Sequence, residues 1–233
     1  MRFGAVLFDA GETLVHPSPS FPDLFTRVLA TEGYVRTHDD VLEASKAVFH
    51  RFSEAARDGD LWTTSPERSA VFWRGVYERM LEALGLPGRD GLRDALYATF
   101  TDLGNYALFD DVGPTLDALA PTGAVLGVVS NFEAWLEDLL GRLGVRDRLP
   151  VRVISGIVGI EKPDPAIWEL ALERAGVPAE DAAYVGDNPE FDVWPAAALG
   201  MTPVLIDRRG RFPDHDGARI VDLRDLPAAL EVA

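Results

Sequence analysis

Four short segments of this chain carry the side chains best suited to chemistry, and each follows an apolar run. Asp9 follows Ala-Val-Leu-Phe, Ser130-Asn131 follows Val-Leu-Gly-Val-Val, and Asp187 follows Tyr-Val-Gly. Lys162, one of only two lysines, lies in a loop after another apolar run. Such runs predict buried strands of a parallel sheet, whose carboxyl ends meet at one edge. Two carboxylates, a hydroxyl and an ammonium at that edge suit a divalent cation and a phosphoryl group.

The composition excludes several other kinds of site. The 233 residues contain no cysteine, which rules out disulfides, thiol nucleophiles and cysteine–zinc sites. The four histidines are scattered, which argues against a shared zinc ion. A formal net charge of −16 disfavours nucleic acid and anionic membranes as partners, because both attract clustered cations. No apolar stretch approaches the ~18 residues of a membrane span, so we expect a cytoplasmic protein.

The elements that must position these residues follow two patterns. Residues 4–8 and the later apolar runs alternate with helical segments, which predicts an α/β fold: a Rossmann-like parallel sheet with helices on both faces. Residues 23–103 instead show apolar side chains at helical spacing. Ser65-Pro66 is typical of a helix start. An earlier helix is predicted to present an apolar face of Val41, Leu42, Val48, Phe49 and Phe52.

We therefore predict two domains. Residues 1–16 and 107–233 form an α/β core, and residues 17–106 form an inserted α-helical cap. The segment from His16 to Pro22 is rich in proline and serine, which indicates a linker. Asp110-Asp111 is expected to cap the helix that re-enters the core.

The order of the four segments resembles the haloacid dehalogenase superfamily. The matching motifs are Phe8-Asp9-x-x-x-Thr13-Leu14, Val129-Ser130-Asn131, Lys162-Pro163-Asp164-Pro165, and Gly186-Asp187-Asn188 with Asp192. A helical insert directly after the first motif is similar to the small cap of that family. The resemblance implies a phosphohydrolase that acts on a small phosphorylated metabolite through an aspartyl-phosphate, with Mg²⁺ as its cofactor.

The resemblance also implies a role for each motif residue. Asp9 would attack phosphorus and form the covalent intermediate. The Mg²⁺ would be held by Asp9, the backbone carbonyl of Gly11, Asp187, and Asp192 as a ligand or beside the ligands. The phosphoryl oxygens would accept hydrogen bonds from Thr13, Ser130 and the amide of Asn131. Lys162 would bridge the nucleophile and the phosphoryl group.

The first motif departs from the family pattern at Gly11. Phosphatases of the family usually carry a second aspartate there, which protonates the leaving oxygen and later activates water. Such general acid–base help is typically worth about 10²–10⁴-fold. Three outcomes are open: Glu12 takes over the role, the substrates are acyl or aryl phosphates that need little protonation, or turnover is lost and binding remains.

Two other functions compete with phosphate hydrolysis. A haloacid dehalogenase also uses an aspartate nucleophile, needs no metal and lacks the second aspartate. Asp187 and Asp192 weigh against it, because an attack on carbon has no use for a magnesium site. The third candidate is a non-catalytic protein that binds a phosphoryl ligand on the same scaffold. The sequence leaves the oligomeric state open.

Overall fold

The chain folds into two compact units in a computed structural model that describes residues 3–58 and 61–232. Side chains are described throughout these ranges except at residues 49–53, 55–58 and 232. The α/β unit comprises Met1–Val15 and Leu108–Ala233, and the helical unit comprises His16–Ala107. No helix in the described ranges is both long and apolar enough to cross a membrane.

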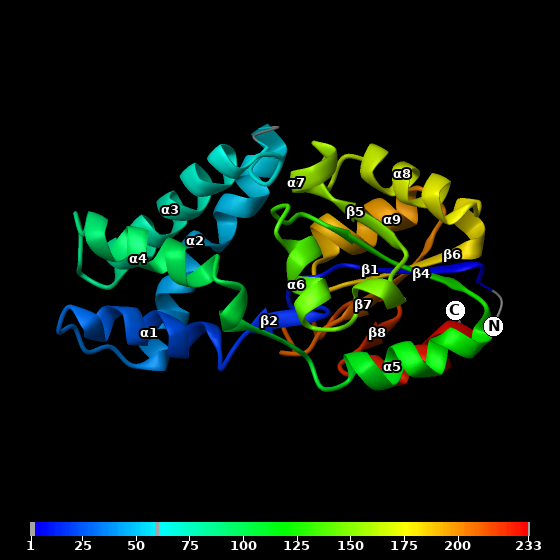
Figure 1. The fold of residues 1–233 in the computed structure, drawn as a ribbon, viewed down its shortest axis with the longest axis horizontal. Coiled ribbons are helices and arrows are strands. Elements are labelled where there is room, and N and C mark those ends of the chain that lie inside the picture. The colour runs from blue at the N-terminus through cyan, green and yellow to red at the C-terminus, as the bar shows by residue number, and fades with distance from the viewer. Residues whose placement is uncertain (1–2, 59–60, 233) are drawn as a thin grey trace. The chain divides into compact units, whose positions relative to one another are not determined.

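A six-stranded parallel sheet forms the centre of the α/β unit (Figure 1). Its strand order is β5-β4-β1-β6-β7-β8. The strands are β1 (Ala5–Phe8), β4 (Val125–Ser130), β5 (Val151–Ile154), β6 (Ala182–Gly186), β7 (Thr202–Ile206) and β8 (Arg219–Ile220). All residues of β1 and β6 are buried, which explains why these strands are continuous apolar runs. The predicted Rossmann-like sheet is confirmed.

Helices cover both faces of this sheet, with α8 and α9 on one side and α5 on the other (Figure 1). The α-helices are α5 (Val112–Leu119), α6 (Leu136–Arg142), α7 (Ser155–Val158), α8 (Ala166–Ala175), α9 (Trp194–Ala198) and α10 (Leu226–Val232). A π-helical turn, Pro189–Val193, directly precedes α9. Short 3-10 turns occur at Ala120–Thr122, Arg146–Arg148, Ala179–Asp181 and Leu223–Asp225.

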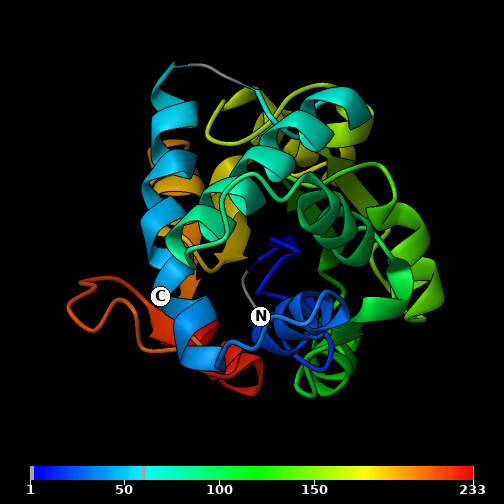
Figure 2. The ribbon, with the colours of Figure 1, turned by 90° about the vertical axis from the view of Figure 1, so that its left-hand side faces the viewer.

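The described residues of the helical unit form a bundle of helices (Figure 2). These are α1 (Phe21–Thr31), α2 (His38–Asp58), α3 (Pro66–Ala83) and α4 (Asp90–Phe100), followed by a 3-10 turn at Leu103–Asn105. Aromatic rings fill part of its core: the Phe100 ring lies 4.8 Å from that of Phe21 and 5.6 Å from that of Tyr77. Ser65 caps α3 by accepting the Arg68 N–H, as its position before Pro66 predicts.

The apolar face predicted for α2 is correct only in part. Val41 and Val48 are buried, but the Leu42 side chain is 39% exposed. Leu42 adjoins Val41 in the chain, and adjacent positions on a helix point about 100° apart. The predicted positions Phe49 and Phe52 lie outside the residues whose side chains are described.

The predicted linker from His16 to Pro22 is shorter than expected. Val15–Pro17 forms β2, which pairs with β3 (Tyr106–Leu108) in a separate two-stranded sheet. Ser20 then caps α1 by accepting the Asp23 N–H, and Pro22 fits in the first helical turn. Proline and serine at these positions therefore mark a strand end and a helix start.

Candidate functional site

Lys162 lies between two carboxylates at the carboxyl edge of the sheet. Its ammonium donates to Asp9 Oδ1 at 2.7 Å and to Asp192 Oδ1 at 2.6 Å. All three side chains are buried. Burial opposes the charged ammonium, but the Asp192 and Asp9 carboxylates outweigh it and raise the pKa of Lys162 above its usual value. Lys162 therefore provides a permanent positive charge beside Asp9.

Ser130 and Asn131, at the end of β4, hold the nucleophile candidate and the lysine loop. The Ser130 hydroxyl donates to Asp9 Oδ1 at 2.9 Å. The Asn131 side chain accepts the Lys162 N–H at 2.6 Å and donates to the Lys162 carbonyl at 2.8 Å. These two bonds fix the lysine loop to the end of β4, and the phosphoryl contact of Asn131 stays a prediction.

Asp187 and Asp192 join Asp9 in an acidic cluster. One oxygen from each carboxylate lies within 4.8 Å of the other two. Burial and the charges of Asp192 and Asp9 raise the pKa of Asp187 to about 7, against the opposing effect of Arg211. Burial also raises the pKa of Asp192, which Lys162 opposes. Among the described residues, the three carboxylates pair with two cations, Lys162 and Arg211, and this excess negative charge favours a bound cation.

The backbone brings Asp192 close to Asp187 by two local devices. Asp192 lies in the π-helical turn, a geometry frequent at functional sites. A Cβ at Gly186 would lie 2.3 Å from the Asp192 carboxyl carbon, so only glycine permits this approach. The Asn188 N–H then donates to Asp192 Oδ2 at 3.0 Å.

These donors fit a magnesium ion. The cluster offers only carboxylate oxygens, the hard ligands that Mg²⁺ prefers, and contains neither nitrogen nor sulfur donors. Thr13 is a further candidate for binding a ligand: its hydroxyl is buried and has no hydrogen-bond partner among the described residues. A buried hydroxyl without a partner is costly unless a ligand satisfies it.

Gly11 and Glu12 are placed differently from the other first-motif residues. A Cβ built on Gly11 would have no other atom within 4 Å, so the position faces open space. Glu12 adopts a positive φ of 57°, and its carboxylate accepts from Arg209 Nη2 at 2.7 Å. Glu12 does not belong to the acidic cluster formed among the described residues. Its role as the acid–base group stays a prediction that this contact does not support.

Tyr184 is a site residue that the sequence reasoning missed. Its hydroxyl lies 3.2 Å from Lys162 Nζ, 3.0 Å from Asp192 Oδ1 and 2.9 Å from the Val129 carbonyl. Burial, followed by the Asp192 and Asp9 charges, raises the pKa of Tyr184 well above its usual value. Trp168 packs its ring against Tyr184 at 5.7 Å. The sequence offered one indication of this role: Tyr184 places a polar hydroxyl in an otherwise apolar run that predicts a buried strand.

A second missed group is the segment Arg208–Arg211, which follows β7. Arg208 donates to both Asp111 oxygens, at 2.7 and 3.0 Å, and to the Thr13 carbonyl at 2.8 Å. The side chain of Asp111 was expected to cap α5, but it makes no such hydrogen bond, because Arg208 and the Leu223 N–H occupy its carboxylate. The sequence offered one indication of this role: three arginines follow the end of a predicted strand, where the other site residues also lie.

Comparison with known proteins identifies the family. The sequence pattern of the haloacid dehalogenase-like hydrolases matches residues 3–200. The chain belongs to this family. A phosphoserine phosphatase from Thermus thermophilus is 34% identical over 78% of this chain and 73% of that enzyme. An (S)-2-haloacid dehalogenase 4A from Burkholderia cepacia is 27% identical over 92% of this chain and 87% of that enzyme.

The fold of this haloacid dehalogenase-like hydrolase is shared with solved structures. The putative HAD-hydrolase YfnB from Bacillus subtilis, bound to magnesium, matches with a TM-score of 0.76 at 18% identity, and the match covers 99% of both chains. At that identity the likeness concerns the fold alone. Because the relatives of the chain include both a phosphatase and a dehalogenase, family membership establishes a hydrolase, and the choice of reaction depends on the site.

Proposed function

We propose that this hydrolase is a Mg²⁺-dependent phosphatase in which Asp9 is the nucleophile. The observation that carries the proposal is the set of contacts on Asp9: Ser130 and Lys162 both donate to Oδ1, and the Asp187 and Asp192 carboxylates lie close by. An anionic nucleophile and a phosphoryl group repel each other. Fixed positive charge between them lowers that repulsion in the transition state.

The magnesium ion would be held by the Asp9 and Asp187 carboxylates and the Gly11 carbonyl. Asp192 Oδ1 is already bonded to Lys162, and its Oδ2 accepts the Asn188 N–H. We therefore assign Asp192 a place beside the ligands, where its charge holds Lys162 and the cation together. The bound cation would supply charge neutralisation for the carboxylate and the phosphoryl oxygens.

The residues then divide the reaction into two displacements. A carboxylate oxygen of Asp9 bonds to phosphorus while the bond from phosphorus to the leaving oxygen breaks, which gives an aspartyl-phosphate. Water then displaces Asp9 from phosphorus and releases inorganic phosphate. The Thr13 hydroxyl and the Asn131 N–H would donate to the phosphoryl oxygens, and Lys162 would bridge Asp9 and phosphate. The Ser130 hydroxyl has one proton, so it would donate to a phosphoryl oxygen only by turning away from Asp9 Oδ1 when the substrate binds.

Substrates with good leaving groups suit this site best. Gly11 supplies no acid, and the Glu12 carboxylate is bonded to Arg209. We therefore propose small aryl or acyl phosphates, whose leaving groups need little protonation, as the substrate class. By family resemblance, we also propose that the helical unit acts as a cap that admits substrate and excludes bulk water.

The test is turnover of p-nitrophenyl phosphate and acetyl phosphate with and without Mg²⁺. We expect metal-dependent release of phosphate, which Asp9→Asn lowers by at least about 10³-fold because a neutral amide is a poor nucleophile. Asp117→Asn is the matched control, since Asp117 is exposed in an ion pair with Arg148. Full turnover by the Asp9 variant would remove Asp9 from the proposed role.

Two results would favour the alternatives. Chloride release from 2-chloropropionate without added metal would identify a dehalogenase, consistent with the dehalogenase relative and with Gly11 in the first motif. Stabilisation by phosphate with Mg²⁺, while every phosphate ester survives incubation, would identify a binding protein without turnover.

A further inference from the structure

Arg211 lies in a rigidly built turn after β7. The buried Asp207 carboxylate accepts the N–H groups of Arg211 and Phe212 at 2.8 and 2.9 Å. Arg219 pairs with the same carboxylate at 2.9 Å, and Gly210 takes the positive φ of 64° that the turn requires. The backbone that carries Arg211 is therefore fixed by contacts that are independent of the acidic cluster.

The Arg211 guanidinium occupies one oxygen of Asp187. Nη2 donates to Asp187 Oδ2 at 2.6 Å and to the Asp187 carbonyl at 3.3 Å. Asp187 is the cluster carboxylate that Lys162 does not contact: the ammonium bonds to Asp9 and Asp192. Arg211 thus neutralises the one carboxylate of the cluster that the lysine leaves uncompensated.

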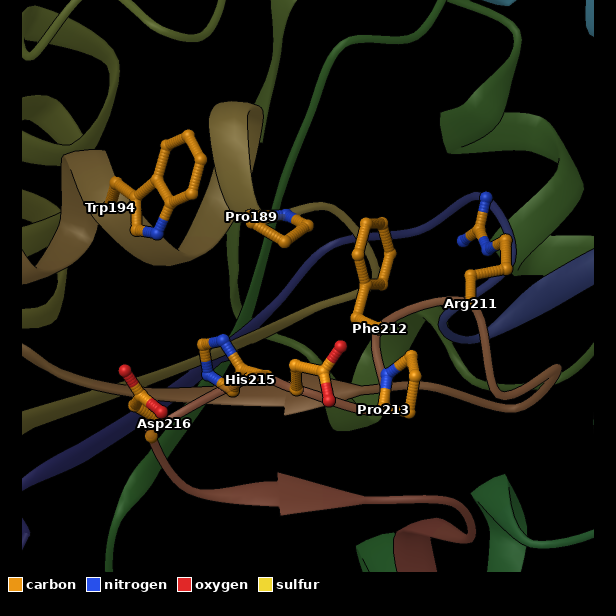
Figure 3. A pocket seen from close by; sticks show the side chains of 9 residues that line it. Pro189, Trp194, Arg211, Phe212, Pro213, His215 and Asp216 are labelled. Atoms are coloured by element: carbon orange, nitrogen blue, oxygen red, sulfur yellow. The ribbon is translucent and has the colours of Figure 1, made fainter.

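The two cations of the site differ in how firmly they are held. Lys162 is enclosed, with only 3% of its side chain exposed, whereas Arg211 is 34% exposed. Arg211 also lines a pocket of about 580 Å³ (Figure 3). Asp214 and Asp216 also line this pocket and add negative charge to it. Arg211 can therefore leave Asp187 without opening the core.

We propose that Arg211 is the counter-cation of the metal-free site and that it limits the affinity for Mg²⁺. The inference rests on the magnesium site of the proposed function. A divalent ion on Asp187 must either displace the guanidinium or bind a few ångströms from its positive charge. Both routes weaken binding, because like charges at such distances repel strongly where water is partly excluded.

The experiment measures Mg²⁺ binding by thermal unfolding of the whole chain at constant ionic strength. A ligand that binds only the folded state raises Tm as its concentration passes Kd. We expect Arg211→Gln to lower the half-saturating Mg²⁺ concentration, which is the Kd fitted to the rise in Tm, by about tenfold. The melting temperature of the metal-free protein should also fall, since Asp187 loses its partner. Isothermal titration calorimetry gives the same Kd independently.

Three further variants make the test specific. Arg209→Gln removes the same charge from the same turn, but Arg209 is 55% exposed and pairs with Glu12, which lies outside the acidic cluster. Its loss should therefore change the Mg²⁺ midpoint by less than about threefold. Arg211→Lys keeps the charge and should stay near the wild-type midpoint. Arg211→Met removes the charge but keeps an unbranched side chain, and it replaces the glutamine variant if that one unfolds.

An unchanged or higher midpoint in Arg211→Gln would overturn the inference and make Arg211 an orienting group for Asp187. A shift of equal size in Arg209→Gln or Arg211→Lys would overturn it as well. If the wild-type protein gains no stability from MgCl₂ beyond that from matched NaCl, the proposed metal site fails together with the inference. A normal wild-type response with no difference in Arg211→Gln overturns the inference alone.

Discussion

The α/β unit buries charged side chains, whereas the side chains that the helical unit buries among its described residues are all neutral. Among the described residues, the buried charged side chains all belong to the α/β unit: Asp9, Asp111, Glu161, Lys162, Asp192 and Asp207. The buried polar side chains of the helical unit are Thr63 and Ser69. Buried charges are tolerated only in pairs, and removing one partner is far costlier than losing the pair. We therefore expect turnover and stability to be coupled in the α/β unit, where loss of a buried charge lowers both. We expect them to be separable in the helical unit, where loss of a core side chain lowers stability alone.

Lys162→Met is expected to have the largest effect, because it should lower both turnover and stability. We expect turnover to fall by at least about 10³-fold, because Asp9 loses its fixed positive neighbour. Stability should fall by about 3–5 kcal/mol, because Asp9 and Asp192 are left as adjacent buried carboxylates. Denaturant unfolding and phosphate release measure the two losses. Lys46→Met, at an exposed ion pair in the helical unit, should change neither.

Phe100→Ala tests whether the core of the helical unit contributes to stability alone. The Phe100 ring is 6% exposed and contacts both Phe21 and Tyr77, so its removal should cost about 3–5 kcal/mol. The half-saturating Mg²⁺ concentration should remain that of the wild type, because no ionic group changes. Calorimetry and the Mg²⁺ titration check the two statements. A tenfold change in that concentration would show that the two units are not separable in this sense.

Gly11→Asp adds one more carboxyl group to the α/β unit, close in sequence to Asp9 of the acidic cluster. The position has room for a side chain, and a carboxyl there would restore the acid that family phosphatases usually carry. We expect turnover of alkyl phosphates to rise by about 10–10²-fold, with little change for aryl phosphates. The ratio of kcat/KM for a sugar phosphate to that for p-nitrophenyl phosphate measures the effect. An unchanged ratio would exclude leaving-group protonation as the missing step.

The sequence predicted the parts of the site that depend on strand ends. Asp9, Ser130 and Asp187 follow apolar runs, and the topology brings such positions to one edge whatever the details of packing. Lys162 was singled out because lysine is rare in this chain. The contact of Arg211 with Asp187 could not be found in this way, since it depends on the path of a turn after β7. The pairing of Glu12 with Arg209 could not be predicted for the same reason, because it depends on the path of the same turn.

Side-chain partners also decided the cases in which local patterns failed. Asp111 has the residue type and position of a helix cap, but a nearby guanidinium is a stronger partner for its carboxylate than backbone N–H groups. Tyr184 occupies a strand position that an apolar residue would fill equally well by pattern. Its hydroxyl is explained by three partners that the pattern does not reveal: the buried lysine, the buried aspartate and the Val129 carbonyl.

The pairing of β2 with β3 has a consequence for the insertion. Paired strands lie about 4.8 Å apart, so the chain leaves the α/β unit and returns to it at almost the same point. A tight turn spans that distance. The path of the chain therefore allows the whole insertion to be exchanged, enlarged or deleted without changing the register of β1 with β4 and β6.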